Sequence, residues 1–134
     1  METNSRPVVV KRAPERLNAR AAREFLRDVQ AFLTADRPQL VFDLSQVAQL
    51  DAAGIEMLLH CMGQAQKRDG DVKLAALSDH AAVMLELTRT ERLFEIYETS
   101  TDAARSFSGF LPNAMRQQLL HQKRIARSEF PAAA

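Results

Sequence analysis

The sequence predicts an α/β domain, built on a mostly parallel sheet of about four strands with helices packed on it. Short apolar runs alternate along the chain with longer segments in which apolar residues recur every three or four positions, as in amphipathic helices. The run Leu40–Leu44 follows Pro38 and is apolar at every position except Asp43. Such a run is typical of a strand buried on both faces, and strands of this kind occur in parallel sheets covered by helices.

The N-terminal part of the chain is expected to contain one strand and one helix. Residues 1–6 are polar and expected to be flexible, whereas Val8–Val10 is a β-branched run typical of a strand. Asn18 is a favourable N-cap, and apolar residues follow it at helical spacing until Asp36–Pro38 breaks the pattern. These apolar residues are Ala22, Phe25, Leu26, Val29, Phe32 and Leu33.

A second helix is predicted after the central strand. Asp51 precedes three small residues and an apolar series at helical spacing, so its carboxylate lies where an N-cap acceptor belongs. We expect this helix to begin near Ala52 and to end at Lys67–Asp71, where Gly70 is suited to a left-handed cap. Parallel α/β folds place their binding sites at the C-terminal edge of the sheet, so the start of this helix is a candidate site.

The rest of the domain continues the alternation of strands and helices. Residues 72–77 and 93–98 are predicted strands, and residues 78–87 and 100–107 are predicted helices. The expected N-caps of these two helices are Ser78 and then Thr101 or Ser100. Alternation of this kind is the connectivity of a parallel sheet.

The stretch Leu40–Leu59, LVFDLSQVAQLDAAGIEMLL, resembles the core signature of STAS domains, the fold of bacterial anti-sigma factor antagonists. A second stretch, Leu87–Thr99, is similar to the same family, and the likeness extends from Val8 to Phe107. The residues shared with the signature are Asp43, Leu44, Ser45, Val47, Asp51, Gly54 and Ile55. STAS domains normally begin with two strands before the first helix, so the resemblance implies that the first family strand is missing here.

The chain divides into a flexible N-terminus (1–6), a STAS-like domain (7–108) and a C-terminal helical extension (109–134). Residues Ala103–Ser128 include five Lys or Arg and no acid, so this segment carries +5 in a chain whose net charge is +1. We expect Pro112–Arg127 to form a helix that covers the sheet edge left bare by the missing strand.

Composition disfavours several classes of function. The glycines, at positions 54, 63, 70 and 109, cannot form a phosphate-binding loop or a dinucleotide fingerprint. The His and Cys residues lack metal-ligand spacing, and the single cysteine, Cys61, suggests a buried structural thiol in a reducing cytoplasm. The apolar runs are far shorter than the ~20 residues that span a bilayer, and the basic tail lacks interleaved aromatic residues. We therefore expect a cytoplasmic protein that is not an enzyme, needs no cofactor or metal, does not insert into membranes and does not bind nucleic acid.

Asp43 and Asp51 are the one pair of side chains considered as a chemical site. Both are expected near the C-terminal edge of the sheet, where two close carboxylates could share a proton or a divalent cation. We favour a structural interpretation, in which Asp43 bonds to its own loop and Asp51 caps the helix.

The resemblance implies a partner-binding surface at the start of the second helix. In anti-sigma factor antagonists, the serine just before the motif glycine is phosphorylated by the partner anti-sigma factor, which is also a kinase, and phosphorylation abolishes binding. Ala53 stands at that position here, so this switch cannot operate and the surface stays uncharged. We expect Glu56 and Met57 on the outside, within a surface that has an apolar centre. The expected partner-binding residues are Asn18, Ser45, Asp51, Ala52, Ala53, Gly54, Glu56 and Met57.

The function predicted first is a non-catalytic STAS module that antagonises an anti-sigma factor of the ATPase and kinase type. An alternative is a regulatory subunit of a lipid-transporting ABC system, because small STAS subunits of that kind share Leu58-Leu59-His60 and Lys67 with this chain. A scaffold subunit of a stress-signalling complex is a third option, and an enzyme built on the Asp43 and Asp51 pair is the last. The sequence leaves open whether the protein forms a homodimer.

Overall fold

The computed structural model describes residues 7–108, which form a parallel four-stranded sheet with helices on both faces. The strand order is β1-β3-β5-β6, and every neighbouring pair is parallel. The strands are β1 (Val9–Arg12), β2 (Arg16–Leu17), β3 (Gln39–Asp43), β4 (Gln49–Leu50), β5 (Asp71–Ala75) and β6 (Ile96–Tyr97). The helices are α1 (Ala19–Leu33), α2 (Ala52–Gln66), α3 (Asp79–Leu87), the 3₁₀ turn η1 (Thr90–Leu93) and α4 (Ser100–Ser106). The predicted fold class is confirmed.

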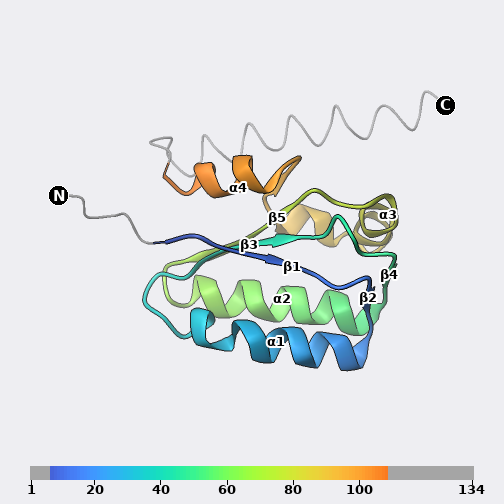
Figure 1. Ribbon diagram of the computed structural model, residues 1–134, viewed down its shortest axis with the longest axis horizontal. Coiled ribbons are helices and arrows are strands. Elements are labelled where there is room, and N and C mark those ends of the chain that lie inside the picture. Colours follow the sequence, from blue (N-terminus) through green and yellow to red (C-terminus); the bar gives the residue numbers. More distant parts are fainter. Residues whose placement is uncertain (1–6, 109–134) are drawn as a thin grey trace.

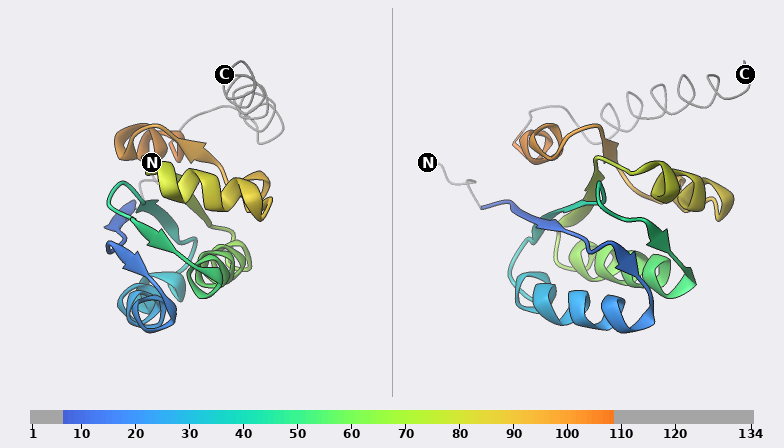
Figure 2. Two further views of the ribbon diagram at one scale, coloured as in Figure 1. Left: turned by 90° about the vertical axis from the view of Figure 1, so that its right-hand side faces the viewer. Right: turned by 45° about the vertical axis from the view of Figure 1, so that its right-hand side comes forward.

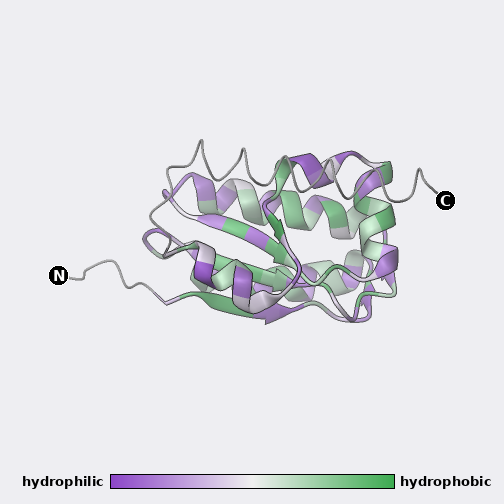
Figure 3. Ribbon diagram, turned by 90° about the horizontal axis from the view of Figure 1, so that it is seen from above, coloured by the Kyte–Doolittle hydropathy of each residue, from purple (hydrophilic) through white to green (hydrophobic). Residues whose placement is uncertain are grey.

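Helices cover the two faces of the sheet unequally. Helices α1 and α2 lie side by side below it, and the short helix α4 lies above it (Figure 1). The lower layer contains the larger core, in which Phe25 and Phe42 meet edge to face with ring centres 4.9 Å apart. The upper layer is built from small residues, chiefly Val41, Ala75 and Ala103. Along each helix, hydrophobic and hydrophilic residues alternate, as expected of helices with one buried face (Figure 3).

A second, two-stranded sheet was not predicted. Strands β2 and β4 are parallel, and Leu17 is paired with Leu50. Each strand is only two residues long and leads directly into a helix, β2 into α1 and β4 into α2. Two residues are too few to produce an alternating pattern, so this sheet left no sign in the sequence.

Several predicted boundaries are wrong in detail. Helix α4 is capped by Thr99, whose side chain accepts a hydrogen bond from the Asp102 amide, and Ser100 is already helical. The left-handed residue after α2 is Asp69, at φ 64°, rather than Gly70. Gly70 is required for another reason, because a Cβ there would collide with the backbone of Pro38. Leu93 belongs to η1, so the last strand is shorter than predicted.

Strand β1 forms one edge of the main sheet. Within residues 7–108 its only neighbour is β3. Two strands, β1 and β2, precede α1 where one was expected, and the absence of the first family strand stays a prediction because residues 1–6 lie outside the described residues. Val10 in this strand is 48% exposed. The extension predicted to cover this edge, Pro112–Arg127, lies outside the described residues, so its docking remains a prediction.

Candidate functional site

The candidate site is the place where helices α1 and α2 begin. Because Leu17 and Leu50 are paired in parallel strands, the next residues, Asn18 and Asp51, occupy equivalent positions on neighbouring strands. Both are N-caps, as predicted: the Asn18 side chain accepts from the Ala21 amide at 3.0 Å, and Asp51 accepts from the Gly54 amide at 3.1 Å. The β2–β4 sheet therefore brings together two residues that are 33 positions apart in sequence.

Gly54 shapes this site from beneath. It is buried, and a Cβ at this position would lie 2.5 Å from the Leu17 carbonyl oxygen and 2.7 Å from Leu50 Cδ1. Only a glycine lets the first turn of α2 approach the β2–β4 sheet this closely. Gly54 thus contributes geometry to the site, and its own atoms are not available for contact with a partner.

The loop between β3 and α2 is held in place from several directions. The Ala48 amide donates to the Glu15 carbonyl at 2.7 Å, and the Leu50 amide donates to His80 Nε2 at 3.0 Å. Ser78 Oγ donates to the Val47 carbonyl at 2.6 Å. Because these bonds come from both the β1–β2 connection and the start of α3, the surface is ordered before any partner arrives.

Asp43 anchors the beginning of the same loop, as the structural interpretation predicted. Its Oδ1 accepts from the Ser45 amide at 2.8 Å, and its Oδ2 accepts from Ser100 Oγ at 3.2 Å. Burial acts to raise the pKa of Asp43, but the hydrogen bonds from Ser45 and Ser100, helped by Arg12, bring it below its ordinary value. Asp43 therefore stays ionised and serves as an acceptor for its loop.

The structure places the predicted partner-binding residues at different depths. Asn18, Ser45, Asp51, Ala52 and Glu56 are exposed, and Ala53 is half-buried. Ser45 contacts Asp43 rather than the first turn of α2. The surface that remains at the start of α2 is small and mostly polar.

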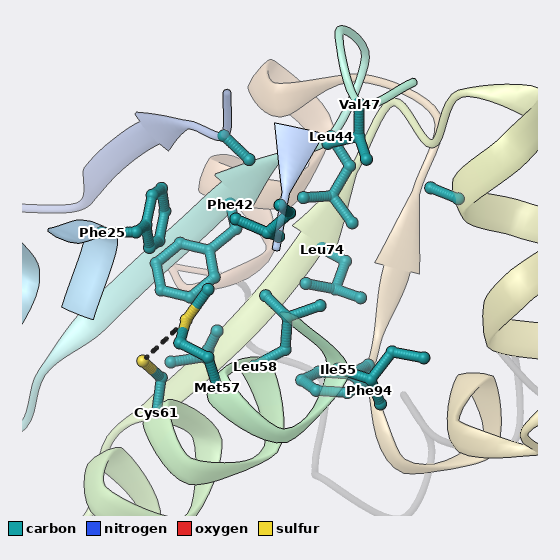
Figure 4. Close-up of a cluster of buried hydrophobic side chains, with 14 of the residues drawn as sticks. Phe25, Phe42, Leu44, Val47, Ile55, Met57, Leu58, Cys61, Leu74 and Phe94 are labelled. Carbon is teal, nitrogen blue, oxygen red and sulfur yellow. Dashed lines mark hydrogen bonds between the residues drawn. The ribbon is translucent and has the colours of Figure 1, made fainter. Parts of the chain in front are cut away.

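The expectation that Met57 lies outside is wrong. Met57 is 6% exposed, and Cys61 Sγ lies 3.7 Å from its Sδ inside the lower core (Figure 4). Ile55 is also buried, so the expected apolar centre of the surface belongs to the core. Helix α2 packs against α1 as well as against the sheet, which widens its buried face beyond the stripe seen in the sequence. Cys61 is buried as predicted, and burial raises the pKa of its thiol to about 12.

Two residues that hold the site were not recognised from the sequence. His80 has no metal-ligand spacing, and its acceptance of a hydrogen bond from the Leu50 amide spans 30 residues of sequence. Ser78 was predicted only as a cap, which it is, yet its hydroxyl also fixes the loop at Val47. A sequence pattern within one helix or strand cannot predict hydrogen bonds between residues about 30 positions apart. Within residues 7–108, no three His, Cys, Asp or Glu side chains are grouped closely enough to hold a metal ion.

Comparison with known proteins identifies the family of the chain. Residues 4–95 match the family described as "Mlab, STAS domain", which is more than half of the chain. The chain belongs to the STAS domain family. In the part of the chain that the structure describes, no helix is long and apolar enough to cross a membrane.

Solved STAS structures have the same fold at low sequence identity. An anti-sigma-factor antagonist (STAS) domain protein from Planctomyces limnophilus has a TM-score of 0.67 and 19% identity, over 75% of this chain and 90% of that one. The STAS domain of a SulP transporter from Vibrio cholerae has a TM-score of 0.60 and 19% identity, over 78% and 83%. At these identities the likeness establishes the fold, which serves proteins of different function.

Proposed function

We propose that this STAS domain is a non-catalytic module that binds a signalling partner protein through the start of α2. The partner class that we propose is an anti-sigma factor of the kinase type. The observation that supports this function is the start of α2, where the cap Asp51 and Ala52 are exposed and the preceding loop is held by hydrogen bonds from other elements. Such a preorganised surface suits protein recognition, because little conformational entropy is lost on binding.

Ala52 and Ala53 make the proposed interaction constitutive. Neither side chain has a hydroxyl, so a partner kinase has no acceptor in the first turn of α2. The nearest hydroxyl before this turn is Ser45, whose backbone amide is bonded to Asp43. A phosphate at position 53 would add nearly two negative charges beside Asp51 and oppose binding. The alanines keep the first turn of α2 free of phosphate.

Restoring the missing hydroxyl tests this proposal. The wild type and an Ala53→Ser variant are each incubated with a purified kinase-type anti-sigma factor and ATP, and phosphate is located by mass spectrometry. We expect the wild type to bind and to remain unmodified, whereas A53S becomes phosphorylated and loses affinity. Ala53 is only half-buried, so the variant is expected to keep its fold. Stoichiometric phosphate on Ser45 of the wild type, or failure of the wild type to bind, would contradict the proposal.

A second candidate function is supported by the description of the matching family and by Leu58-Leu59-His60 with Lys67. This second function is that of a regulatory subunit of a lipid-transporting ABC system. The two functions differ in the partner. A transporter ATPase would copurify equally with the wild type and with A53S, whether or not the kinase and ATP had been added. Stable binding to an ATPase of that class, without binding to an anti-sigma factor, would favour the second function.

A further inference from the structure

Helix α1 presents a row of arginines that the fold itself does not use. Arg20, Arg23 and Arg27 follow an i, i+3, i+7 spacing, which places them on one side of a helix. All three are exposed, while the opposite face of α1 buries Ala22, Phe25, Val29 and Leu33. We refer to Arg20, Arg23 and Arg27 as the arginine row.

Most of this positive charge is uncompensated within the described residues. Arg20 lies 3.5 Å from Glu24, and both side chains are largely exposed. The other acid on α1, Asp28, lies 3.9 Å from Lys11 of β1. Arg23 and Arg27 form no ion pair or side-chain hydrogen bond with any residue between 7 and 108. Their charges therefore contribute little to folding and are available to another molecule.

The arginine row adjoins the proposed partner surface. Helix α1 begins after Asn18, which lies beside Asp51 at the start of α2, so the two helices start at the same end of the domain. They then run side by side on the same face of the sheet (Figure 2). A protein that covers the start of α2 can thus extend over α1 without crossing another element.

We propose that the arginine row is an extension of the partner-binding surface and receives an acidic segment of the partner protein. The inference rests on the proposed function, since it concerns the same partner. Every member of the row is arginine, and the planar guanidinium pairs with carboxylates through two parallel hydrogen bonds, which lysine cannot do. Exposed charges of this kind mainly accelerate association and set orientation, because water screens them until the partner is docked.

The decisive variant is the double charge reversal Arg23→Glu and Arg27→Glu in the full chain. Its matched control is Lys67→Glu and Arg68→Glu, which changes the net charge equally at the far end of α2, about 22 Å from its start at 1.5 Å per residue. Binding to the purified kinase-type anti-sigma factor is measured by surface plasmon resonance between about 0.05 and 0.5 M salt. We expect the arginine variant to bind about tenfold more weakly, mostly through a slower association rate and with a smaller salt dependence. The control is expected to stay within about threefold.

Each other outcome has a defined meaning. If Ala53→Asp abolishes binding but both double variants behave alike, the proposed function stands and the arginine row is not part of the interface. If Ala53→Asp and both double variants leave binding unchanged, the proposed surface itself is wrong. In a parallel arm, vesicles of phosphatidylglycerol and phosphatidylcholine are mixed with the wild type and the arginine variant. Flotation of the wild type alone with these vesicles, with equal binding of both to the anti-sigma factor, would assign the row to anionic lipid and overturn the inference.

Discussion

The two faces of the sheet are stabilised by different interactions, although the same strands supply the side chains of both. In β3 and β5, Phe42 and Leu74 are paired and point into the lower core, while Val41 and Lys73 are paired and belong to the face below α4. The lower face is therefore apolar and large, and two long helices cover it. The upper face has small apolar residues and buried charges, and a helix of seven residues covers it.

Lys73 is the centre of the upper face. It is 1% exposed, and its Nζ lies 3.1 Å from Glu95 Oε1 and 2.6 Å from Ser106 Oγ of α4. The ammonium group also lies 4.1 Å from the centre of the Phe107 ring. Asp43 and Asp71 are at alternate positions of the same strands, so β3 and β5 bring three ionisable groups to this face, beside Glu95. The comparison indicates that the packing of large apolar side chains stabilises the lower face, whereas the pairing of buried charges stabilises the upper one.

Breaking the buried pair is expected to have the largest effect. Lys73→Ala leaves the Glu95 carboxylate without its cation in a largely buried position, and we expect a loss of about 3 kcal/mol in the free energy of unfolding. The double variant Lys73→Met with Glu95→Gln removes both charges and is expected to recover most of that loss. Urea unfolding at neutral pH measures both. Equal destabilisation by the two variants would show that side-chain volume, rather than charge, governs this face as well.

A glycine pair sharpens the comparison on the lower face. Gly54→Ala is expected to cost about 1 to 3 kcal/mol, because the added Cβ would overlap Leu17 and Leu50. Gly63 is in the same helix, and a Cβ there would meet no atom within 4 Å. Gly63→Ala should therefore stabilise the protein by about 0.5 to 1 kcal/mol through helix propensity. Thermal melting of both variants tests this, and a similar loss in both would mean that close approach at Gly54 is unimportant.

The smallest expected effects concern two aspartates of the upper face whose pKa values shift in opposite directions. Burial and the nearby Glu95 raise the pKa of Asp71 above 3.8, despite hydrogen bonds from Val72 and Gln66, whereas the net effect at Asp43 is a lowered pKa. Asp43 thus contributes stability above pH 3.8 that is lost as the pH falls through its folded pKa. The contribution of Asp71 has the other sign, and stability falls as the pH rises from 3.8 through its folded pKa.

Asparagine substitutions separate these two contributions. At neutral pH, Asp43→Asn should lower the unfolding midpoint in urea, and Asp71→Asn should leave it unchanged or raise it, since an amide oxygen can still accept from the Val72 amide. Below pH 3.8 both differences from the wild type should shrink. A pH-independent difference for either variant would attribute its effect to packing.

Most features that the sequence determined are local ones. The caps Asn18, Asp51 and Ser78 were predicted and are observed, because an N-cap bonds an amide only three residues ahead in the chain. The buried run of β3 and the amphipathic pattern of α1 were equally clear, since each is a periodicity within one element. The family signature around Gly54 also depends on contiguous residues, so the amino-acid sequence alone is enough to select the start of α2 as the candidate site.

Tertiary structure decided the features that depend on distant contacts. Met57 is buried because α1 packs against α2, and the position of α1 depends on the β2–β4 pairing, which no sequence period reports. Gly70 is required by Pro38, 32 residues earlier, and Leu50 is bonded to His80, 30 residues later. Lys73 interrupts an apolar strand, and only the fold shows that Glu95 and Ser106 surround its charge. The physical reason is the same in each case: a residue's spacing along the chain encodes its own element, whereas burial and pairing depend on which other elements fold against it.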